Sequence, residues 1–255
     1  MLFDTHIHTQ YSTDSRMKIE DAVKEGKKQQ LGLVITEHMD LDYPRPEAFV
    51  FDVNRYFQEY EQYRGDSVLL GIELGMRPHV GEANRQIIAG HPFDYVIGSI
   101  HLVDGLDIYY EEFYRNRSKQ EAYNRYFDSM LECLKLHDFI DSLGHIDYIA
   151  RYARYQDPEV YFRDFAERID QILTVLVERQ KAIEINTRRF DRQQVVESLL
   201  PIYKRFGELG GRWATIGSDA HDAAGIGKEI AAAREIAERC NLKTVYYKQR
   251  VPIEQ

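Results

Sequence analysis

Cysteine is scarce in this chain of 255 residues, and so is any sequence feature of a secreted or membrane protein. The only two cysteines, Cys133 and Cys240, have no CxxC spacing, which makes a disulfide framework unfavourable. No apolar run is long enough to span a bilayer, and the start, Met1-Leu2-Phe3-Asp4, lacks the basic and apolar regions of a secretory signal. These absences predict a cytoplasmic protein that does not enter the membrane.

The chain also has an excess of acidic over basic residues and no segment with the composition of a flexible linker. There are 33 basic against 42 acidic residues, so the formal net charge is −9 and the average surface repels nucleic acid and anionic membranes. No segment rich in proline, glycine or serine divides the chain. We therefore expect one domain over residues 1–255, with no nucleic-acid partner.

Short segments of β type alternate with longer helical patterns along the chain. Two of the former, Leu31–Ile35 and Val68–Ile72, are continuously apolar, as parallel strands covered on both faces are. Strands are expected at Leu2–His8, Leu31–Glu37, Val68–Glu73, Tyr95–His101, Phe139–His145, Ala182–Asn186 and Trp213–Ser218, with a short last strand at Val245–Tyr247. Helices are expected at Ile19–Gln30, Val53–Arg64, Gly81–Ala89, Lys119–His137, Val160–Arg179, Gln193–Leu209 and Ile226–Cys240. This alternation predicts an α/β barrel or a doubly wound sheet.

Histidines and carboxylates recur at the carboxyl ends of these strands. They are His6, His8, His38, Glu73, His101, His145, Asp219 and His221. In a barrel the strand ends converge on one mouth, whereas residues on the outer strands of an open sheet would lie too far apart to share ions. The pattern therefore favours a seven-unit barrel with a metal site at the C-terminal mouth of its strands.

The spacing within the motifs fits metal binding. His6 and His8 lie two apart on a strand, so their side chains project from the same face, and Asp219 with His221 repeats this spacing. Glu73 can bridge two ions because a carboxylate has two oxygens. Either pair alone could arise by chance, and a glutamate at a strand end is often only solvated. Because histidines and carboxylates recur at most of the strand ends, the sequence nevertheless predicts a polynuclear site with imidazole and carboxylate ligands.

Together these motifs resemble those of the polymerase-and-histidinol-phosphatase (PHP) superfamily. The resemblance rests on Asp4-Thr5-His6-Ile7-His8, Thr36-Glu37-His38, Gly71-Ile72-Glu73, Gly98-Ser99-Ile100-His101, Gly144-His145-Ile146-Asp147 and Ser218-Asp219-Ala220-His221. Within this superfamily, the chain resembles the PHP-type histidinol-phosphate phosphatases. This narrower resemblance rests on the chain length, on the residues around His101 and His145, and on Glu184-Ile185-Asn186-Thr187.

The resemblance implies a distorted (β/α)7 barrel holding three divalent ions of zinc, manganese or iron. The first ion would be bound by His6, His8, Glu73 and Asp219, and the second by Glu73, His101 and His145. The third would take His38, His221 and a residue of the loop after His8. Many relatives have a histidine in that loop, and here the candidate is Asp14, which could instead cap the helix that begins near Lys18. The residues expected to act in catalysis are Glu73, Asp219 and His221.

The charges of such a site favour a phosphate monoester. Three divalent ions carry six positive charges, and Glu73, Asp14 and Asp219 offset only three of them. A hydroxide that bridges two ions and a dianionic phosphate would complete the neutralisation, and attack of that hydroxide on phosphorus is the expected reaction. Arg151 and Arg188 follow the fifth and sixth strands and are the candidate phosphate ligands. Arg189 is an alternative to Arg188, and any of these arginines could instead form ordinary ion pairs.

The resemblance implies that the function is hydrolysis of L-histidinol phosphate in histidine biosynthesis. A cationic alcohol would favour acidic residues beyond the ions, and Asp40, Asp42, Glu111 and Glu112 are candidates, although any one of them is more readily explained as a solvated loop acid. The alternatives are a PHP phosphatase acting on phosphotyrosine proteins or nucleotides, and a catalytically silent metal-binding protein. A proofreading nuclease is less consistent with the net charge of −9. The sequence predicts no oligomeric state.

Overall fold

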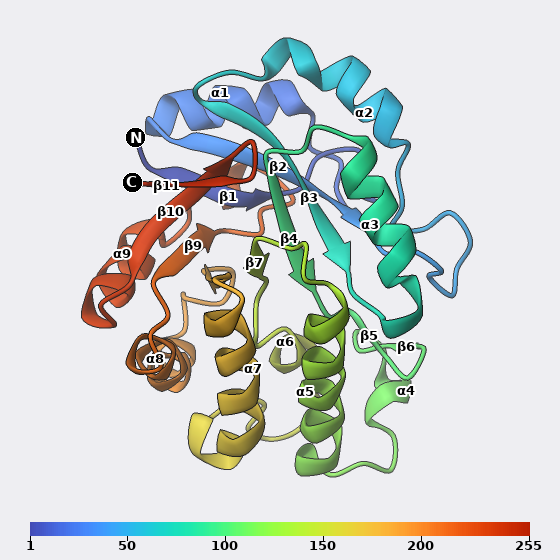
Figure 1. Ribbon diagram of the computed structural model, residues 1–255, viewed down its shortest axis with the longest axis vertical. Helices are drawn as coiled ribbons and strands as arrows, with labels where there is room; N and C mark the ends of the chain where they lie inside the picture. Colours follow the sequence, from blue (N-terminus) through green and yellow to red (C-terminus); the bar gives the residue numbers. More distant parts are fainter.

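The strands of the computed structural model, which describes residues 1–255, lie side by side in the order in which they occur along the chain. Figure 1 shows that the sheet curls, with the helices on its outer side. The order is β1-β2-β3-β4-β7-β8-β9-β10-β11, and all neighbours are parallel except β10 and β11. The bounds are β1 Phe3–Ile7, β2 Gly32–Met39, β3 Val68–Gly75, β4 Tyr95–Ser99, β7 Ser142–Leu143, β8 Ala182–Asn186, β9 Trp213–Gly217, β10 Lys243–Lys248 and β11 Val251–Glu254.

The helices confirm the alternation that the sequence predicts. They are α1 Ile19–Gln29, α2 Val53–Tyr60, α3 Gly81–Gly90, α4 Glu111–Tyr114, α5 Lys119–Leu136, α6 Ile149–Tyr152, α7 Ala166–Glu178, α8 Gln193–Glu208 and α9 Ile230–Arg239. The short helices α4 and α6, the hairpin of β5 (Leu102–Val103) and β6 (Leu106–Asp107), and β11 were not predicted. The fifth predicted strand, Phe139–His145, is wrong in length, because only Ser142 and Leu143 pair with their neighbours. None of the helices has both the length and the apolar character needed to cross a membrane.

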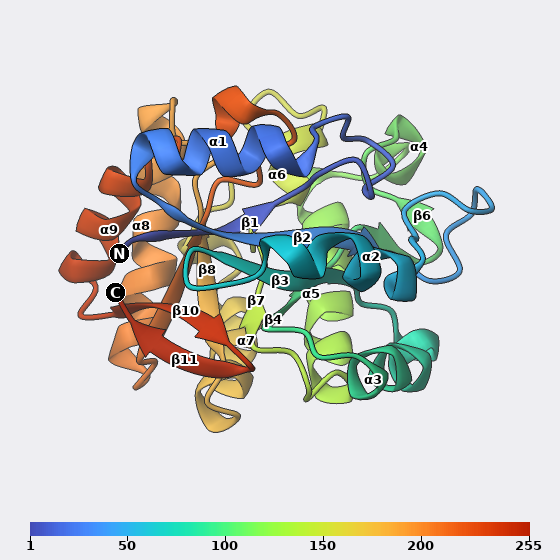
Figure 2. The ribbon, with the colours of Figure 1, turned by 90° about the horizontal axis from the view of Figure 1, so that it is seen from above.

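The barrel closes at one end only, which is why it is distorted. Near the carboxyl ends of the strands, Ile7 forms a bridge with Ala220, and the His8 amide donates to the Ala220 carbonyl at 2.8 Å. At the opposite end, β10 pairs with β9 through Lys243 and Thr244 alone, and then continues into a hairpin with β11. Figure 2 shows this hairpin running beneath the barrel strands. The closed end is the mouth to which the predicted ligands belong.

A bulge in β1 decides where its histidines point. Asp4 pairs with Leu33 and Ile7 with Ile35, so three steps along β1 match two along β2. Without the extra residue, strict alternation would place Phe3 and His6 on opposite faces of the strand. The bulge allows Phe3 to pack inside the bottom of the barrel while His6 faces inward at the mouth.

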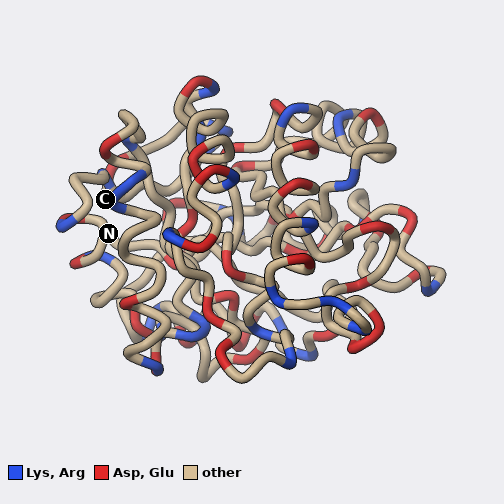
Figure 3. The backbone as a smooth tube through the Cα atoms, turned by 90° about the horizontal axis from the view of Figure 1, so that it is seen from below, with Lys and Arg blue, Asp and Glu red and all other residues tan.

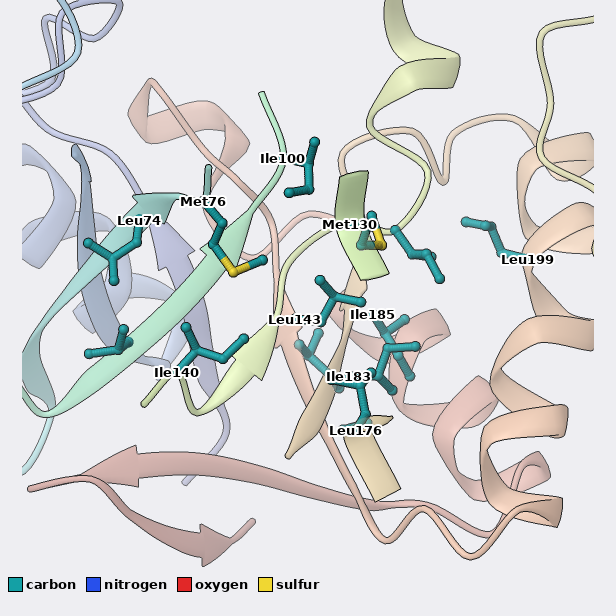
Figure 4. Close-up of a cluster of buried hydrophobic side chains, with 14 of the residues drawn as sticks. Leu74, Met76, Ile100, Met130, Ile140, Leu143, Leu176, Ile183, Ile185 and Leu199 are labelled. Carbon is teal, nitrogen blue, oxygen red and sulfur yellow. The ribbon is translucent and has the colours of Figure 1, made fainter. Parts of the chain in front are cut away.

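Two apolar clusters hold the barrel together. The smaller one fills the bottom of its interior and consists of Phe3, Val34, Leu69, Tyr95, Ile97, Ala182, Val245 and Tyr247. The larger one lies between the outer faces of the strands and the helices. Figure 4 shows part of it, in which Leu143 of β7 and Ile183 of β8 lie among side chains such as Met130 of α5 and Leu176 of α7. The interior below the mouth is therefore packed and dry.

We expect the β10–β11 hairpin to contribute to stability through Tyr247. Its ring stacks on Tyr95 with centroids 5.4 Å apart, and its hydroxyl donates to the Asp141 carbonyl at 3.3 Å. Tyr247→Ala should lower the free energy of unfolding by about 3 kcal/mol, because it opens a cavity in the barrel floor. Urea denaturation measures this. Tyr247→Phe, which removes only the hydroxyl, should cost about 1 kcal/mol, and equal losses in the two variants would contradict the packing role.

Candidate metal centre

The loops that follow the barrel strands bring all the predicted metal ligands to one place. His6 and His8 come from the end of β1, His38 from β2 and Glu73 from β3. The remaining ligands are His101 after β4, His145 after β7, and Asp219 with His221 after β9. All of these side chains are buried except that of His221, which is partly exposed, and the remaining predicted ligand, Asp14 in the loop after β1, is exposed. His79, His91 and His137, which belong to no strand-end motif, lie outside the cluster.

One oxygen of Glu73 faces three histidines. Its Oε2 lies 3.2 Å from His6 Nε2, 3.4 Å from His8 Nε2 and 2.9 Å from His38 Nδ1. Asp219 Oδ1 lies on the same side, 3.4 Å from His8 Nε2 and 4.0 Å from His6 Nε2. This half of the cluster contains the four ligands predicted for the first ion and, in addition, His38, which was predicted for the third.

The other oxygen of Glu73 faces two more histidines. Its Oε1 lies 2.8 Å from His145 Nε2 and 3.3 Å from His101 Nε2, and it accepts a hydrogen bond from Ser99 Oγ at 2.7 Å. Glu73 thus separates two groups of donors, as a bridging carboxylate would.

Several buried ligand atoms have no hydrogen-bond partner, which tests whether ions fit here. They are His6 Nε2, His8 Nε2, His38 Nδ1, His101 Nε2 and Glu73 Oε2. A buried polar atom left unsatisfied costs about 1–3 kcal/mol, so a concentration of them is unfavourable unless a ligand binds. Sets of three such residues have donor atoms within 4.8 Å of one another, among them His6, His8 and Glu73. Imidazole and carboxylate donors at this spacing fit divalent ions.

Asp14 lies where the third set of ligands requires it. Its Oδ1 is 3.6 Å from His38 Nε2, and its Oδ2 is 3.2 Å from His221 Nε2. The alternative role as a helix cap is not found, because Lys18 is the residue that precedes α1 and no side chain caps that helix. His8, His38 and His221 also form a compact set of their own.

Residues behind the candidate ligands fix the orientation of the imidazoles, and sequence reasoning did not predict this role for them. Asp40 Oδ1 accepts from His101 Nδ1 at 2.9 Å, which turns Nε2 of that ring toward Glu73. His8 Nδ1 lies 3.0 Å from Ser12 Oγ, and this hydroxyl in turn donates to Glu37 Oε2 at 2.6 Å. Glu37 stands next to His38 in the predicted motif, but its contact with the loop after His8 depends on how β1 and β2 pair.

The electrostatics follow from Glu73 being buried among histidines. Burial alone would raise its pKa, but His6 and His38 outweigh burial and hold the pKa of Glu73 well below its usual range. Burial would likewise lower the pKa of His38, but Glu73 and Asp14 raise it to about 10. Without ions, protonated histidines therefore provide the positive charge that the carboxylates need. Divalent ions would displace these protons.

Two arginines reach Asp219, and a third does not. Arg151 Nη1 lies 2.5 Å from Asp219 Oδ2, and Arg188 Nη1 donates to the Asp219 carbonyl and lies 3.1 Å from His221 Nδ1. Arg189 instead forms buried ion pairs with Asp147 and Glu159, each at 2.6–2.7 Å. These pairs hold Arg189 away from the cluster and leave Arg151 and Arg188 as the candidate phosphate ligands.

Comparisons with known proteins agree with this geometry. The family description "PHP domain" matches residues 4–188. The probable histidinol-phosphatase of Clostridium acetobutylicum is 51% identical over 98% of both chains. The histidinol-phosphatase of Lactococcus lactis is 31% identical over 92% of this chain and 90% of its own. The crystal structure of histidinol phosphate phosphatase from Lactococcus lactis, complexed with zinc, L-histidinol and phosphate, superposes with a TM-score of 0.93 at 29% identity, over 99% of both chains.

Removal of metal should destabilise the protein. Ligand binding at 1,000 times its dissociation constant stabilises a fold by about 4 kcal/mol, which for a chain of this size corresponds to roughly 10 °C in Tm. We expect EDTA to lower the Tm by about that amount and zinc to restore it, as measured by differential scanning calorimetry. His91→Ala, outside the cluster, should respond as the unmodified protein does. An unchanged Tm on chelation, with metal shown to be released, would contradict a role of the ions in the fold.

Gly217 should be essential to the site, because a side chain there has no room. A Cβ at this position would lie 2.3 Å from His6 Cβ and 2.4 Å from Glu184 Oε1. We expect Gly217→Ala to lose bound metal and about 2 kcal/mol or more of stability through this overpacking. Metal analysis and urea denaturation measure the two effects. Gly90→Ala, where a Cβ meets nothing within 4 Å, is the matched control and should keep both properties.

Proposed function

The chain belongs to the PHP domain family, and we propose that it hydrolyses L-histidinol phosphate to L-histidinol and phosphate, the phosphatase step of histidine biosynthesis. The observation that carries this proposal is the convergence of the ligands around Glu73, in a fold that matches a histidinol phosphate phosphatase over 99% of its length. The 51% identity to the Clostridium protein over nearly the whole chain supports the same enzyme.

The cluster would hold three divalent ions, with zinc favoured by the zinc of the Lactococcus structure and manganese or iron compatible with the same donors. His6, His8, Glu73 and Asp219 would bind the first ion. Glu73, His101 and His145 would bind the second, and Asp14, His38 and His221 the third. Bound there, the ions would supply Lewis acidity, which lowers the pKa of a water and offsets charge on the phosphoryl group.

The protein's own groups bind the phosphate and hold protons. Arg151 and Arg188 approach Asp219 from two loops, so their guanidinium groups can contact a phosphate seated between them and the cluster. Burial would raise the pKa of Asp219, but Arg151 and His6 outweigh it and keep that pKa well below its usual range. Asp219 is therefore ionised near neutral pH, as a metal ligand must be, and its Oδ1 can accept a hydrogen bond from the attacking water. His221 Nδ1, 3.5 Å from this oxygen, orients it.

A cavity of about 230 Å³ beside the cluster is suited to the alcohol part of the substrate. Asp14, His38 and His101 form the wall that it shares with the metal ligands. The rest of its lining is aromatic and acidic apart from one arginine, and consists of Asp40, Tyr43, Arg45, Phe49, Asp107, Tyr109, Tyr110, Tyr148 and Tyr152. Aromatic faces and carboxylates attract a cation, and L-histidinol carries an amine and an imidazole.

Only some of the acidic residues suggested by the sequence reach this cavity. Asp40 lines it, and so does Asp107, which sequence reasoning missed and which accepts a hydrogen bond from Tyr43. Asp42 instead pairs with Arg77 and His79, and Glu111 and Glu112 are exposed on α4. The cationic alcohol would therefore meet Asp40 and Asp107.

The rival functions have less support. Figure 3 shows basic and acidic residues interspersed over the chain, without the basic stripe that holds a nucleic acid. Phosphotyrosine and nucleotide substrates remain alternatives within the same chemistry, and a silent metal-binding protein would not require arginines beside the cluster. A cytoplasmic location stays a prediction.

Phosphate release from L-histidinol phosphate, phosphotyrosine, nucleoside monophosphates and p-nitrophenyl phosphate tests the proposal, with the protein reconstituted with zinc or manganese. We expect kcat/KM for L-histidinol phosphate of about 10⁴ M⁻¹s⁻¹ or more, far above the others. A preference for phosphotyrosine or a nucleotide would move the assignment to that rival. Full metal content without turnover of any monoester would favour the silent protein.

Arg188→Ala should weaken the enzyme mainly through KM. Its side chain is partly exposed at the mouth, so removal should leave the fold intact while deleting a charged contact to phosphate. We expect kcat/KM for L-histidinol phosphate to fall by about 10–100-fold, a loss of roughly 1.4–2.7 kcal/mol of transition-state stabilisation. Steady-state kinetics measure this. Arg192→Ala, an exposed arginine paired with Glu159, is the control and should keep kcat/KM.

A further inference from the structure

Strand β8 ends at the mouth of the barrel without supplying any proposed metal ligand. It carries two inward-facing polar residues instead, Glu184 and Asn186, whose exposed fractions are 0% and 4%. They belong to the motif Glu184-Ile185-Asn186-Thr187, which the metal cluster leaves without a role. Burial of an ionised carboxylate and an amide is costly unless each is fully hydrogen-bonded, so their partners indicate what they do.

Glu184 connects two ligands that come from different strands. Its Oε1 accepts from His6 Nδ1 at 2.7 Å, and its Oε2 accepts from the backbone amide of His145 at 2.6 Å. The first bond fixes the tautomer of His6 that leaves Nε2 free to face Glu73 and Asp219. The second holds the loop after β7, where only a two-residue strand constrains it. One carboxylate thus orients ligands of two proposed ions.

Asn186 connects Glu184 to the arginines. Its Nδ2 donates to Glu184 Oε2 at 3.2 Å, and its Oδ1 accepts from Arg151 Nη2 at 2.9 Å and from the Arg188 backbone amide at 3.2 Å. Arg151 is therefore held at both terminal nitrogens, by Asn186 at Nη2 and by Asp219 at Nη1. Its Nε is buried and has no partner.

The amide at position 186 matters because it is uncharged. A guanidinium group next to a single carboxylate tends to pair with both of its oxygens, which would turn Arg151 toward Asp219 and away from a phosphate. The uncharged Oδ1 of Asn186 accepts from Arg151 Nη2, so it restrains the guanidinium group without offsetting more of the positive charge of that group. An aspartate at 186 would offset that charge and would also repel Glu184.

We propose that Glu184 and Asn186 are positioning residues with separate tasks: Glu184 orients the metal ligands, and Asn186 orients Arg151 for phosphate. This rests on the proposed function only in taking a phosphate as the ligand. Neither residue needs to contact the substrate. The two side chains lie two residues apart on one strand, yet they hold different groups in place. Glu184 contacts His6 and His145, whereas Asn186 contacts Arg151, so substitutions at the two positions should produce different defects.

The first experiment measures zinc affinity, by titrating metal-free protein with Zn²⁺ in competition with a chromophoric chelator. Glu184→Gln keeps the shape of the side chain and removes its charge, and should weaken zinc binding by about 10–100-fold. Asn186→Ala should leave it within about twofold. Glu197→Gln and Asn54→Ala, at exposed positions on α8 and α2, are the matched controls. Equal zinc affinities in Glu184→Gln and the unmodified protein would overturn the role of Glu184.

The second experiment measures the dissociation constant of inorganic phosphate for zinc-saturated protein by calorimetry. Asn186→Ala should raise this dissociation constant by about tenfold in the otherwise unmodified protein. When Arg151→Ala is already present, Asn186→Ala should change the constant little, because the effects of residues that act through one another are not additive. Asn186→Asp should raise it further than Asn186→Ala does. Glu184→Gln, once saturated with zinc, should bind phosphate within about twofold of the unmodified protein.

These outcomes separate positioning from general damage. If Asn186→Ala weakens phosphate binding equally with and without Arg151, Asn186 does not act through that arginine and the proposal is wrong. If Asn186→Ala loses zinc as Glu184→Gln does, the separation of tasks is wrong. A Tm of each variant near that of its control excludes misfolding as the cause. Both titrations are independent of L-histidinol phosphate turnover, so failure of the proposed function would show only in the kinetic assay.

Discussion

The rest of the site depends on one buried carboxylate, that of Glu73. A charge taken out of water in the middle of a barrel is tolerated only if opposite charge surrounds it closely. His6, His38 and His101, at 2.9–3.3 Å and with raised pKa values, provide that charge when protonated, and divalent ions would provide it more strongly. The metal-free protein therefore has ligands already gathered around a centre of negative charge. The cluster is preorganised by its own electrostatics as well as by the fold.

The backbone is adapted to this cluster at places where ordinary strand geometry would obstruct it. The bulge in β1 reverses the alternation between Phe3 and His6, so one strand can fill the floor of the barrel and also supply its mouth. Gly75 and Gly217 lie where a Cβ would come within 2.0 Å of Asp40 Oδ1 and 2.3 Å of His6 Cβ, respectively. Local strand regularity is given up where it would displace a ligand or the residue that orients it.

The convergence of the candidate ligands at one mouth could be predicted from the sequence, because it depends on a short-range rule. A polar residue at the carboxyl end of a parallel strand reaches the barrel mouth whatever the details of packing, so His38 and His101 could be placed from their strands alone. The bulge, the shortness of β7 and the contacts of Asp40 and Glu184 could not be predicted, because each depends on how segments far apart in the chain pair. Glu184 was visible at a strand end, but the sequence does not distinguish an acid that binds metal from one that holds a histidine.

Two regions meet at the mouth of the barrel, one that favours negatively charged groups and one that favours positively charged groups. The proposed metal ligands, together with Arg151 and Arg188, favour an anion, whereas Asp40, Asp107 and the tyrosines of the adjoining cavity favour a cation. A substrate with a phosphate at one end and a protonated amine at the other satisfies both regions at once. A nucleotide would place neutral or anionic groups against these carboxylates and leave them without a partner, which costs affinity. The chain's net charge of −9 is thus compatible with a phosphate ester substrate, because the attraction for phosphate is confined to the cluster and its two arginines.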